Sequence, residues 1–313
     1  MIAATIEAGE VAPREHPDPR PGNGEVLVRV RAAGLNGADI AQRAGHYPAP
    51  PGAPADIPGL ELAGEVIELG PGAMRFELGE RVMAIVGGGG QAELAVVNER
   101  QLMRVPDRLD WPAAGGAPET FTTAHDALFT QCVLLAGERL LVHGGAGGVG
   151  TAAIGLGVAA GARVHATVRN EALREKVAAL GATVIAPEGF AEHGPFDVIL
   201  ELVGAVNLPE NVRALAPEGR IAVIGIGAGF TGELDLRQLM ARRARIHGSM
   251  LRSRTLEDKA LTARRMERSV LPLLAEGAVS VPVAATFALE RVADAYEAFT
   301  AGGKLGKIVL TIG

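Results

Sequence analysis

A glycine-rich hexapeptide is the most specific chemical signal in the sequence. It reads Gly145-Ala146-Gly147-Gly148-Val149-Gly150, and it joins a short apolar segment, residues 139–143, to a small-residue segment of helical type, residues 148–160. In this context the first glycine allows a tight turn, the second lets backbone N–H groups approach a pyrophosphate, and the third lets helix and strand pack closely. The helix N-terminus adds a dipole that favours negative charge. We therefore expect residues 145–150 to bind a dinucleotide; the alternative is a loop that is merely flexible.

The end of the next predicted strand, residues 163–168, indicates which dinucleotide is bound. Proteins that select NAD place an acidic residue there, about 20 residues beyond the glycines, to bind the ribose 2′-hydroxyl. This chain has Arg169 and Asn170 at that point and no carboxylate before Glu171. An arginine pairs with a 2′-phosphate, which a carboxylate would repel. The sequence thus predicts NADPH, with Arg169 as the main contact and Asn170 beside it, unless Arg169 is an ordinary solvated residue at the start of a helix.

The elements around the glycine motif follow the alternation of a doubly wound parallel sheet. The predicted strands cover residues 139–143, 163–168, 197–202 and 220–226, and the predicted helices cover residues 148–160 and 171–180. Such a sheet presents its ligand cleft at the strand ends. Residues 202–204, with Val203, and 225–227, with Gly225 and Ile226, are therefore cofactor-binding candidates, although their glycines also suit plain turns.

The first third of the chain predicts short strands separated by glycine and proline, at residues 25–33, 64–69 and 81–86. Residues 47–58 carry five prolines and residues 87–90 are all glycine, so both segments should be loops that could line a cleft.

The last part of the chain predicts a helix over residues 256–276, another over 289–300 and a strand over 307–311 that must join an existing sheet. We expect a first β-rich part in residues 1–115, a nucleotide-binding domain in 116–256, and a return segment in 257–313 that completes the first domain.

Charge and cysteine content exclude several classes of function. A net charge of −6 leaves no basic surface for a nucleic acid backbone. No apolar run approaches the roughly 20 residues that cross a bilayer, so we expect a cytoplasmic protein with neither nucleic acid nor membrane as partner. Cys132 is the only cysteine, which excludes an intramolecular disulfide and a cysteine-based metal cluster.

The order of a β-rich front, a glycine-rich nucleotide motif and a closing segment, residues 306–310, resembles the medium-chain dehydrogenase/reductases along essentially the whole chain. The zinc alcohol dehydrogenases of that family place a cysteine ligand in a Gly-x-Cys segment and a histidine ligand in a Gly-His-Glu segment. The corresponding residues here are Asn36, after Gly34-Leu35, and Leu60, within Gly59-Leu60-Glu61, so we expect no metal site.

What remains resembles the zinc-free quinone oxidoreductases, which are similar to zeta-crystallin. The segments 42–51, 87–92, 118–124 and 251–254 look like the inducible quinone oxidoreductase subgroup. The resemblance implies an α/β fold with a GroES-like β-rich catalytic domain and a Rossmann domain. It also implies a homodimer joined through an edge strand, here residues 244–251.

The same resemblance suggests further site residues. Asn36 and Tyr47 are the candidate catalytic polar groups beside nicotinamide and substrate, although Tyr47 could simply pack its loop. Thr123 matches a position that contacts the nicotinamide, with a helix cap as the alternative. Arg252 matches a position that reaches toward the cofactor or the mouth of the active site, with a solvated charge as the alternative.

Without a metal to polarise a carbonyl, hydride transfer suits a quinone or an α,β-unsaturated carbonyl, whose conjugation stabilises the resulting anion. We therefore predict an NADPH-dependent quinone oxidoreductase with a small-molecule substrate. The alternatives are an enoyl-thioester or enone reductase, and a protein that binds NADPH with little turnover.

Overall fold

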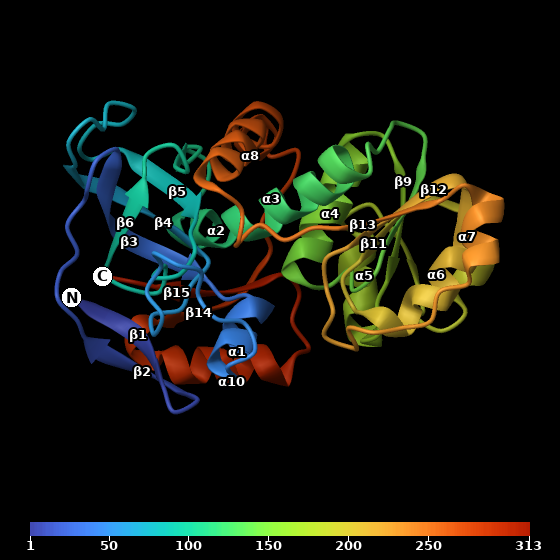
Figure 1. The fold of residues 1–313 in the computed structure, drawn as a ribbon, viewed down its shortest axis with the longest axis horizontal. Helices are drawn as coiled ribbons and strands as arrows, with labels where there is room; N and C mark the ends of the chain where they lie inside the picture. Colours follow the sequence, from blue (N-terminus) through green and yellow to red (C-terminus); the bar gives the residue numbers. More distant parts are fainter.

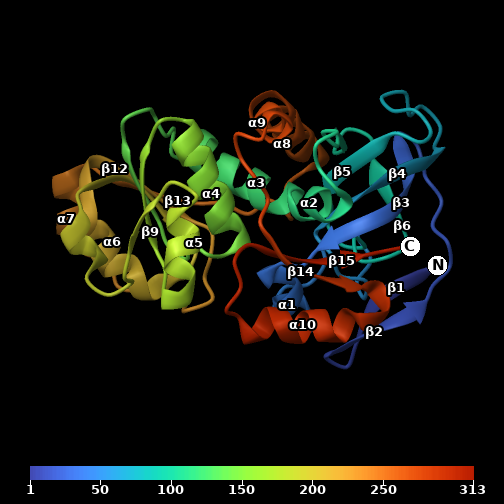
Figure 2. The same ribbon diagram turned by 180° about the vertical axis from the view of Figure 1, so that it is seen from behind.

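The computed structural model describes residues 1–313 as an α/β fold built on two large sheets that lie side by side (Figure 1). A six-stranded parallel sheet forms one half of the molecule, and a seven-stranded mixed sheet forms the other. Both chain termini lie in the seven-stranded half, which is assembled from the first and last parts of the chain (Figures 1 and 2).

The six-stranded sheet has the strand order β10-β9-β8-β11-β12-β13. Its strands are β8 (Arg139–Val142), β9 (Arg163–Thr167), β10 (Thr183–Ile185), β11 (Phe196–Glu201), β12 (Leu215–Val223) and β13 (Arg245–Gly248). The helices between them are α4 (Gly148–Ala159), α5 (Arg174–Ala178), α6 (Leu208–Ala214) and α7 (Leu236–Arg242). The central strands β8 and β11 are apolar on both faces, as expected where helices cover both sides of a sheet. The strand order reverses between β8 and β11, which opens a crevice at their carboxyl ends.

The seven-stranded sheet has the order β14-β15-β3-β4-β5-β7, and β6 pairs with β3. Its strands are β3 (Glu25–Gly34), β4 (Glu61–Leu69), β5 (Arg81–Ile85), β6 (Leu94–Asn98), β7 (Met103–Arg104), β14 (Val283–Ala288) and β15 (Lys307–Thr311). A separate hairpin consists of β1 (Ile2–Glu7) and β2 (Glu10–Glu15), and the helices α1 (Gly37–Arg43) and α10 (Val292–Ala301) belong to this half. As predicted, the strand over residues 307–311 joins an existing sheet, and the structure places it beside β3.

The remaining helices connect the halves: α2 (Trp111–Gly116), α3 (Pro118–His125), α8 (Leu256–Ser269) and α9 (Leu271–Glu276). A π-helical turn, Asp126–Gln131, follows α3, and short 3-10 turns cover Glu171–Leu173, Phe190–His193, Ala205–Asn207 and Leu289–Arg291. One core of 33 buried residues extends across the junction, from Met83 on β5 through Phe121 on α3 to Leu140 on β8. The crevice at the carboxyl ends of β8 and β11 therefore faces the seven-stranded half of the molecule, and the shared core fixes the position of that half.

Two predicted helices differ from the structure. The helix expected over residues 256–276 is broken at Val270 into α8 and α9, because Pro272 lacks the N–H and crowds the preceding turn. The helix expected over residues 171–180 is shortened to a 3-10 turn and α5. None of the helices combines the length and the apolar composition that crossing a membrane would require.

Candidate active site

The glycine-rich loop lies at the carboxyl end of β8 and opens α4, whose N-cap is Gly147. Close packing makes glycine necessary at two of its positions. A Cβ on Gly150 would lie 2.4 Å from the carbonyl oxygen of Gly144, and one on Gly145 would lie 2.8 Å from the Cβ of Ala166. The loop therefore approaches β9 and its own first turn closely, and its backbone lies open to the crevice at Gly147, which is exposed. Such a cradle fits the pyrophosphate of a dinucleotide.

Arg169 and Asn170 are both exposed directly after β9, at the same edge of the sheet. The Asn170 side chain accepts a hydrogen bond from the backbone N–H of Ala172 at 3.1 Å, so it caps the short turn that follows. The nearest carboxylate in sequence, Glu171, is paired with Arg174 at 3.0 Å. The Arg169 guanidinium takes part in none of the ion pairs of the structure, so it is free to pair with a phosphate group of a bound ligand.

Two loops follow β11 and β12, and the first of them, at Val203, lies beside the start of the glycine motif. The Glu201 carboxylate accepts hydrogen bonds from the backbone N–H groups of Val203 at 2.6 Å and Gly204 at 2.9 Å, which fixes the first loop. A Cβ on Gly225 would lie 2.1 Å from the carbonyl oxygen of Leu202, so the second loop crosses the first in contact with it. Ile226 projects outward and is 57% exposed. These loops close one side of the crevice.

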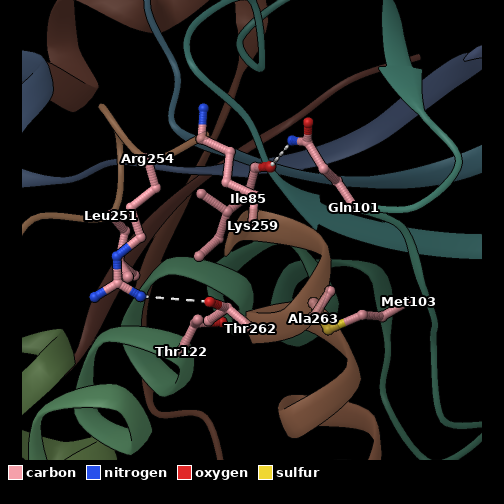
Figure 3. A pocket seen from close by; sticks show the side chains of 9 residues that line it. All are labelled: Ile85, Gln101, Met103, Thr122, Leu251, Arg254, Lys259, Thr262 and Ala263. Carbon is pink, nitrogen blue, oxygen red and sulfur yellow. Dashed lines mark hydrogen bonds between the residues drawn. The ribbon is translucent and has the colours of Figure 1, made fainter. Parts of the chain in front are cut away.

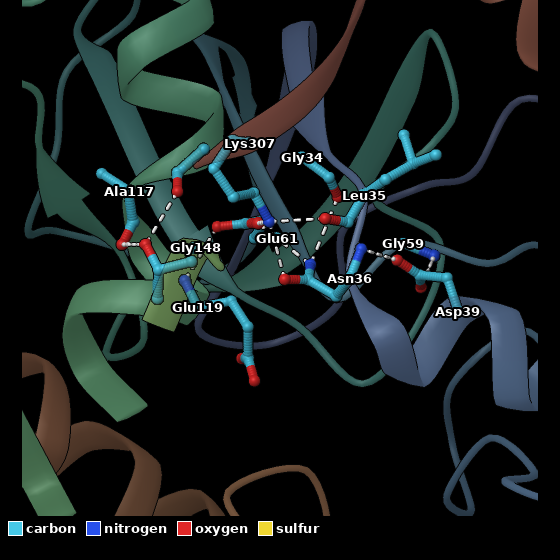
Figure 4. A network of polar contacts seen from close by, with 12 residues as sticks. Gly34, Leu35, Asn36, Asp39, Gly59, Glu61, Ala117, Glu119, Gly148 and Lys307 are labelled. Carbon is cyan, nitrogen blue, oxygen red and sulfur yellow. Dashed lines mark hydrogen bonds and ion pairs between the residues drawn. The ribbon is translucent and has the colours of Figure 1, made fainter. Parts of the chain in front are cut away.

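A buried polar network lies where the C-terminal strand meets the front half of the chain (Figure 4). The Lys307 ammonium donates hydrogen bonds to Leu35 O at 2.6 Å, to Asn36 Oδ1 at 2.7 Å and to Glu61 Oε1 at 2.6 Å. Glu61 Oε2 accepts a further bond from the backbone N–H of Glu119 at 2.8 Å. The Lys307 and Glu61 side chains are 4% and 0% exposed, so this is a fully buried, fully hydrogen-bonded ion pair.

Both the oxygen and the nitrogen of the Asn36 side-chain amide take part in this network. Its Oδ1 accepts from Lys307, and its Nδ2 donates to Glu61 Oε1 at 2.9 Å and to Gly34 O at 3.3 Å. The predicted catalytic Asn36 therefore lies beside the crevice with its hydrogen bonds already directed into the protein. In this arrangement it orients Lys307 and Glu61.

The residues at the family's zinc-ligand positions do not fit a metal ion. The Lys307 ammonium, itself a cation, already binds the Asn36 and Glu61 oxygens that a metal ion would need as ligands. Leu60 is apolar and buried, and Cys132 is buried elsewhere in the core. Nowhere in residues 1–313 do three or more His, Cys, Asp or Glu side chains gather in a way that could hold a metal.

Two carboxyl groups beside the network hold protons more tightly than usual. Burial raises the pKa of Asp39 to about 6, even though its carboxylate accepts hydrogen bonds from the backbone N–H groups of Asn36 and Gly59. Burial, and then the nearby charge of Glu61, raise the pKa of Glu119 to about 7. The Glu119 side chain is partly exposed, and it accepts a hydrogen bond from the Thr123 hydroxyl at 3.3 Å. Thr123 thus lies one helical turn from a titratable carboxyl.

Tyr47 and Arg252 contact each other and lie near Glu119. The Arg252 guanidinium, 5% exposed, donates to Tyr47 O at 2.9 Å, to Gly87 O at 2.8 Å and to Gln42 Oε1 at 2.6 Å. It also lies 5.0 Å from the centre of the Tyr47 ring. Arg252 therefore ties the proline-rich loop and the glycine loop, residues 87–90, to the end of the parallel sheet, and it holds Tyr47 in place.

A hollow between β5, β7, α3 and α8 adjoins these residues (Figure 3). Thr122, Leu251 and Lys259 line it, and Thr122 and Leu251 directly precede Thr123 and Arg252 in the chain. The Thr122 hydroxyl is buried without a hydrogen-bond partner. With a volume of about 20 Å³, the hollow has room for about one water molecule.

Sequence reasoning missed three residues of this site: Glu61, Glu119 and Lys307. Each lies within a segment that resembles the family, but none has a local pattern that assigns it a role. A lone glutamate at a helix start usually serves as a favourable charge for the helix dipole. Their proximity to one another arises only in the folded chain.

The fold and the site define a two-part dehydrogenase or reductase whose crevice receives a dinucleotide. Two family models match the chain: Alcohol dehydrogenase GroES-like domain over residues 22–107, and Zinc-binding dehydrogenase over residues 180–310. The human quinone oxidoreductase is 30% identical over 307 residues, which cover 94% of this chain and 91% of that protein. The polyketide synthase GfsB of Streptomyces halstedii is 32% identical over 295 residues, which cover 92% of this chain but only 5% of the synthase.

Solved structures agree with these similarities. An alcohol dehydrogenase superfamily protein from Novosphingobium aromaticivorans superposes with a TM-score of 0.87 at 29% identity, with both chains fully covered. A mycobacterial protein complexed with NADPH gives a TM-score of 0.87 at 26% identity, over 99% of this chain and 100% of that one. The chain belongs to the medium-chain dehydrogenase/reductase superfamily, among the relatives of the quinone oxidoreductases, and it is an oxidoreductase.

Proposed function

We propose that this enzyme transfers hydride from NADPH to a quinone or another conjugated carbonyl, without a catalytic metal. The observation that carries the proposal is the Lys307 ammonium, which is held by Asn36, at one of the two ligand positions of the zinc-dependent relatives, and by Glu61, the residue after the other. A simple ketone needs a strong electrophile at its oxygen, whereas a conjugated acceptor spreads the charge that hydride brings. The similarity to quinone oxidoreductases over nearly the whole chain supports the same acceptor class.

The chain's own residues supply binding and orientation, and the bound nicotinamide supplies the hydride. The glycine-rich loop, Gly145 to Gly150, would hold the pyrophosphate, while Val203 and the Gly225-Ile226 loop would cover the cofactor. Thr123 would contact the nicotinamide end. Tyr47, positioned by Arg252, would bind the acceptor oxygen.

The preference for NADPH rests on the end of β9. Arg169 is exposed there with no ion-pair partner, and Glu171 is paired with Arg174, so a 2′-phosphate would meet a free guanidinium. The similarity to a protein solved with NADPH supports this choice.

Reduction of an enone or an enoyl thioester is the second candidate. Two polyketide synthases match almost the whole of this chain, at 32% and 30% identity. The two candidates share the cofactor and differ in the acceptor alone.

We also propose a homodimer formed through β13, the edge strand of the parallel sheet. Its Ile246 is 36% exposed, and the neighbouring Met240 and Met250 are 75% and 54% exposed. A second copy of the edge would pair with the free backbone groups and cover these apolar side chains. Light scattering measures this state directly.

The experiment that tests the proposed function compares initial rates of NADPH oxidation with an ortho-quinone, with an enone and with a saturated ketone, in the presence of a metal chelator. We expect chelator-resistant turnover with a conjugated acceptor and no acceleration by the saturated ketone. Tight NADPH binding without acceleration by any acceptor would refute enzymatic reduction of this class and favour a binding role.

A further inference from the structure

We propose that the Glu119 carboxyl is the acid that protonates the reduced acceptor, a role that rests on the proposed function. Neither the sequence motifs nor the named relatives assign a proton donor. Glu119 instead emerges from its place among the site residues.

Glu119 lies where the two halves of the molecule meet. It sits in the first turn of α3, and its backbone N–H is fixed by Glu61 Oε2 at 2.8 Å. The next residue, Thr120, packs against the glycine-rich loop so closely that a Cβ on Gly148 would lie 2.8 Å from its Cγ2. The helix start is thus held against both the cofactor loop and the buried network.

The Glu119 side chain is directed away from that network. Figure 4 shows its carboxyl group turned away from the Lys307 ammonium, and the side chain is partly exposed. Its one hydrogen bond to another side chain comes from Thr123, at 3.3 Å. The second carboxyl oxygen is left free for an acceptor or a water molecule.

The other polar side chains around Glu119 are less available to an acceptor. The Glu61 and Lys307 side chains form a buried ion pair with each other. The Asp39 side chain is fully buried and accepts hydrogen bonds from two backbone N–H groups. Burial raises the pKa of Tyr47 above its usual value of 10.0, which makes its hydroxyl a weaker acid. Glu119 alone combines partial exposure with titration in the neutral range.

The electrostatic surroundings explain that titration. Burial, Glu61 and Asp39 raise the pKa of Glu119, while Lys307 and the Thr123 hydroxyl lower it, for a result of about 7. Tyr47 and Arg252 face the same carboxyl and respond to its charge. A substantial fraction of Glu119 is therefore protonated at neutral pH, as a general acid requires.

The acceptor gains two electrons and one hydrogen as hydride, which oxidises NADPH to NADP⁺ and leaves an oxyanion or its conjugated enolate. The O–H bond of the Glu119 carboxyl then breaks, and a new O–H bond forms at the acceptor oxygen. Glu119 is left as a carboxylate, which regains its proton from water.

The test is the Glu119→Gln variant, which keeps the size of the side chain and an oxygen to accept from Thr123 but cannot act as a carboxylic acid. We expect wild-type kcat to fall as the pH rises through about 7, because the acid form is lost. In E119Q we expect kcat to fall on the order of 10²-fold at neutral pH and this dependence on pH to vanish. Glu188→Gln, at an exposed glutamate, is the matched control and should behave as wild type.

Glu119→Asp separates chemistry from structure. It should retain the descending limb of the pH profile at a reduced kcat, because it still carries a carboxyl, whereas a purely structural role would leave both variants with the wild-type profile. NADPH affinity should change less than threefold in either variant. Wild-type rates and pH dependence in E119Q would overturn the role of Glu119 alone. A wild type that turns over no conjugated acceptor would instead refute the proposed function, and this inference with it.

Discussion

Replacing Lys307 with methionine removes one charge from the centre of the buried network and changes little else in shape. The ammonium makes three hydrogen bonds of 2.6 to 2.7 Å, and its loss leaves the Glu61 carboxylate, 0% exposed, without a cation. Removing one partner of a buried ion pair costs about 3–5 kcal/mol.

The structure favours the lower end of that range. The Glu61 carboxylate would still accept bonds from Asn36 Nδ2 at 2.9 Å and from the Glu119 N–H at 2.8 Å. We therefore expect Lys307→Met to lower the free energy of unfolding by about 3 kcal/mol. Adding Glu61→Gln removes the stranded charge, so the double variant should recover about half of the loss.

The assay is urea unfolding at neutral pH, followed by circular dichroism, with the two single variants and the double variant as a thermodynamic cycle. Lys176→Met, at an exposed lysine, is the control and should stay within about 0.5 kcal/mol of wild type. A loss below about 1 kcal/mol in Lys307→Met, or a double variant no more stable than Lys307→Met, would refute the account of this network as a tightly coupled ion pair.

Three further predictions concern cofactor, acceptor and pH. Arg169→Asp should raise the KM for NADPH by about 10- to 100-fold, because it removes one hydrogen bond between charged groups. The KM for NADH should stay unchanged or fall, and steady-state rates measure both constants. Arg252→Met should free Tyr47 and lower kcat/KM for the acceptor by about tenfold, with the Kd of NADPH unchanged by fluorescence titration. Asp39 and Glu119 have folded pKa values of about 6 and about 7, above their ordinary 3.8 and 4.5, so their contribution to stability is complete below the ordinary values and is lost as the pH rises through 6 and 7. The free energy of unfolding should therefore fall from about pH 4 to about pH 7, and less steeply in E119Q, when measured with urea.

The parallel sheet could be predicted because its signals are local. Apolar strands, helical segments and a glycine-rich turn alternate along the chain, and the structure places β8, β9 and β11 within about one residue of the predicted ranges. Strands of two or three residues, such as β7 and β10, are too short to show a period and were missed. The break before α9 did have a signal in Pro272, which the amphipathic pattern around it obscured.

The polar network could not be predicted in the same way. Lys307 and Glu61 are 246 residues apart in sequence, and Glu61 and Glu119 are 58 apart, so no periodicity connects them. The resemblance to a family identified Asn36 as a site residue. Only the structure shows that the Asn36 amide is bonded to Lys307 and Glu61, and that the partly exposed carboxyl of Glu119 lies beside them.

A single-turnover measurement of NADPH oxidation by an ortho-quinone, in the presence of a chelator, tests metal-independent hydride transfer most directly. The enzyme, loaded with NADPH, is mixed with the quinone, and the absorbance of the reduced nicotinamide is followed with ordinary NADPH and with the two forms deuterated on either face of C4. We expect rapid, chelator-resistant decay that is slowed by deuterium on one face only. Decay no faster than in the quinone-free control, with all three forms of the cofactor, would contradict it.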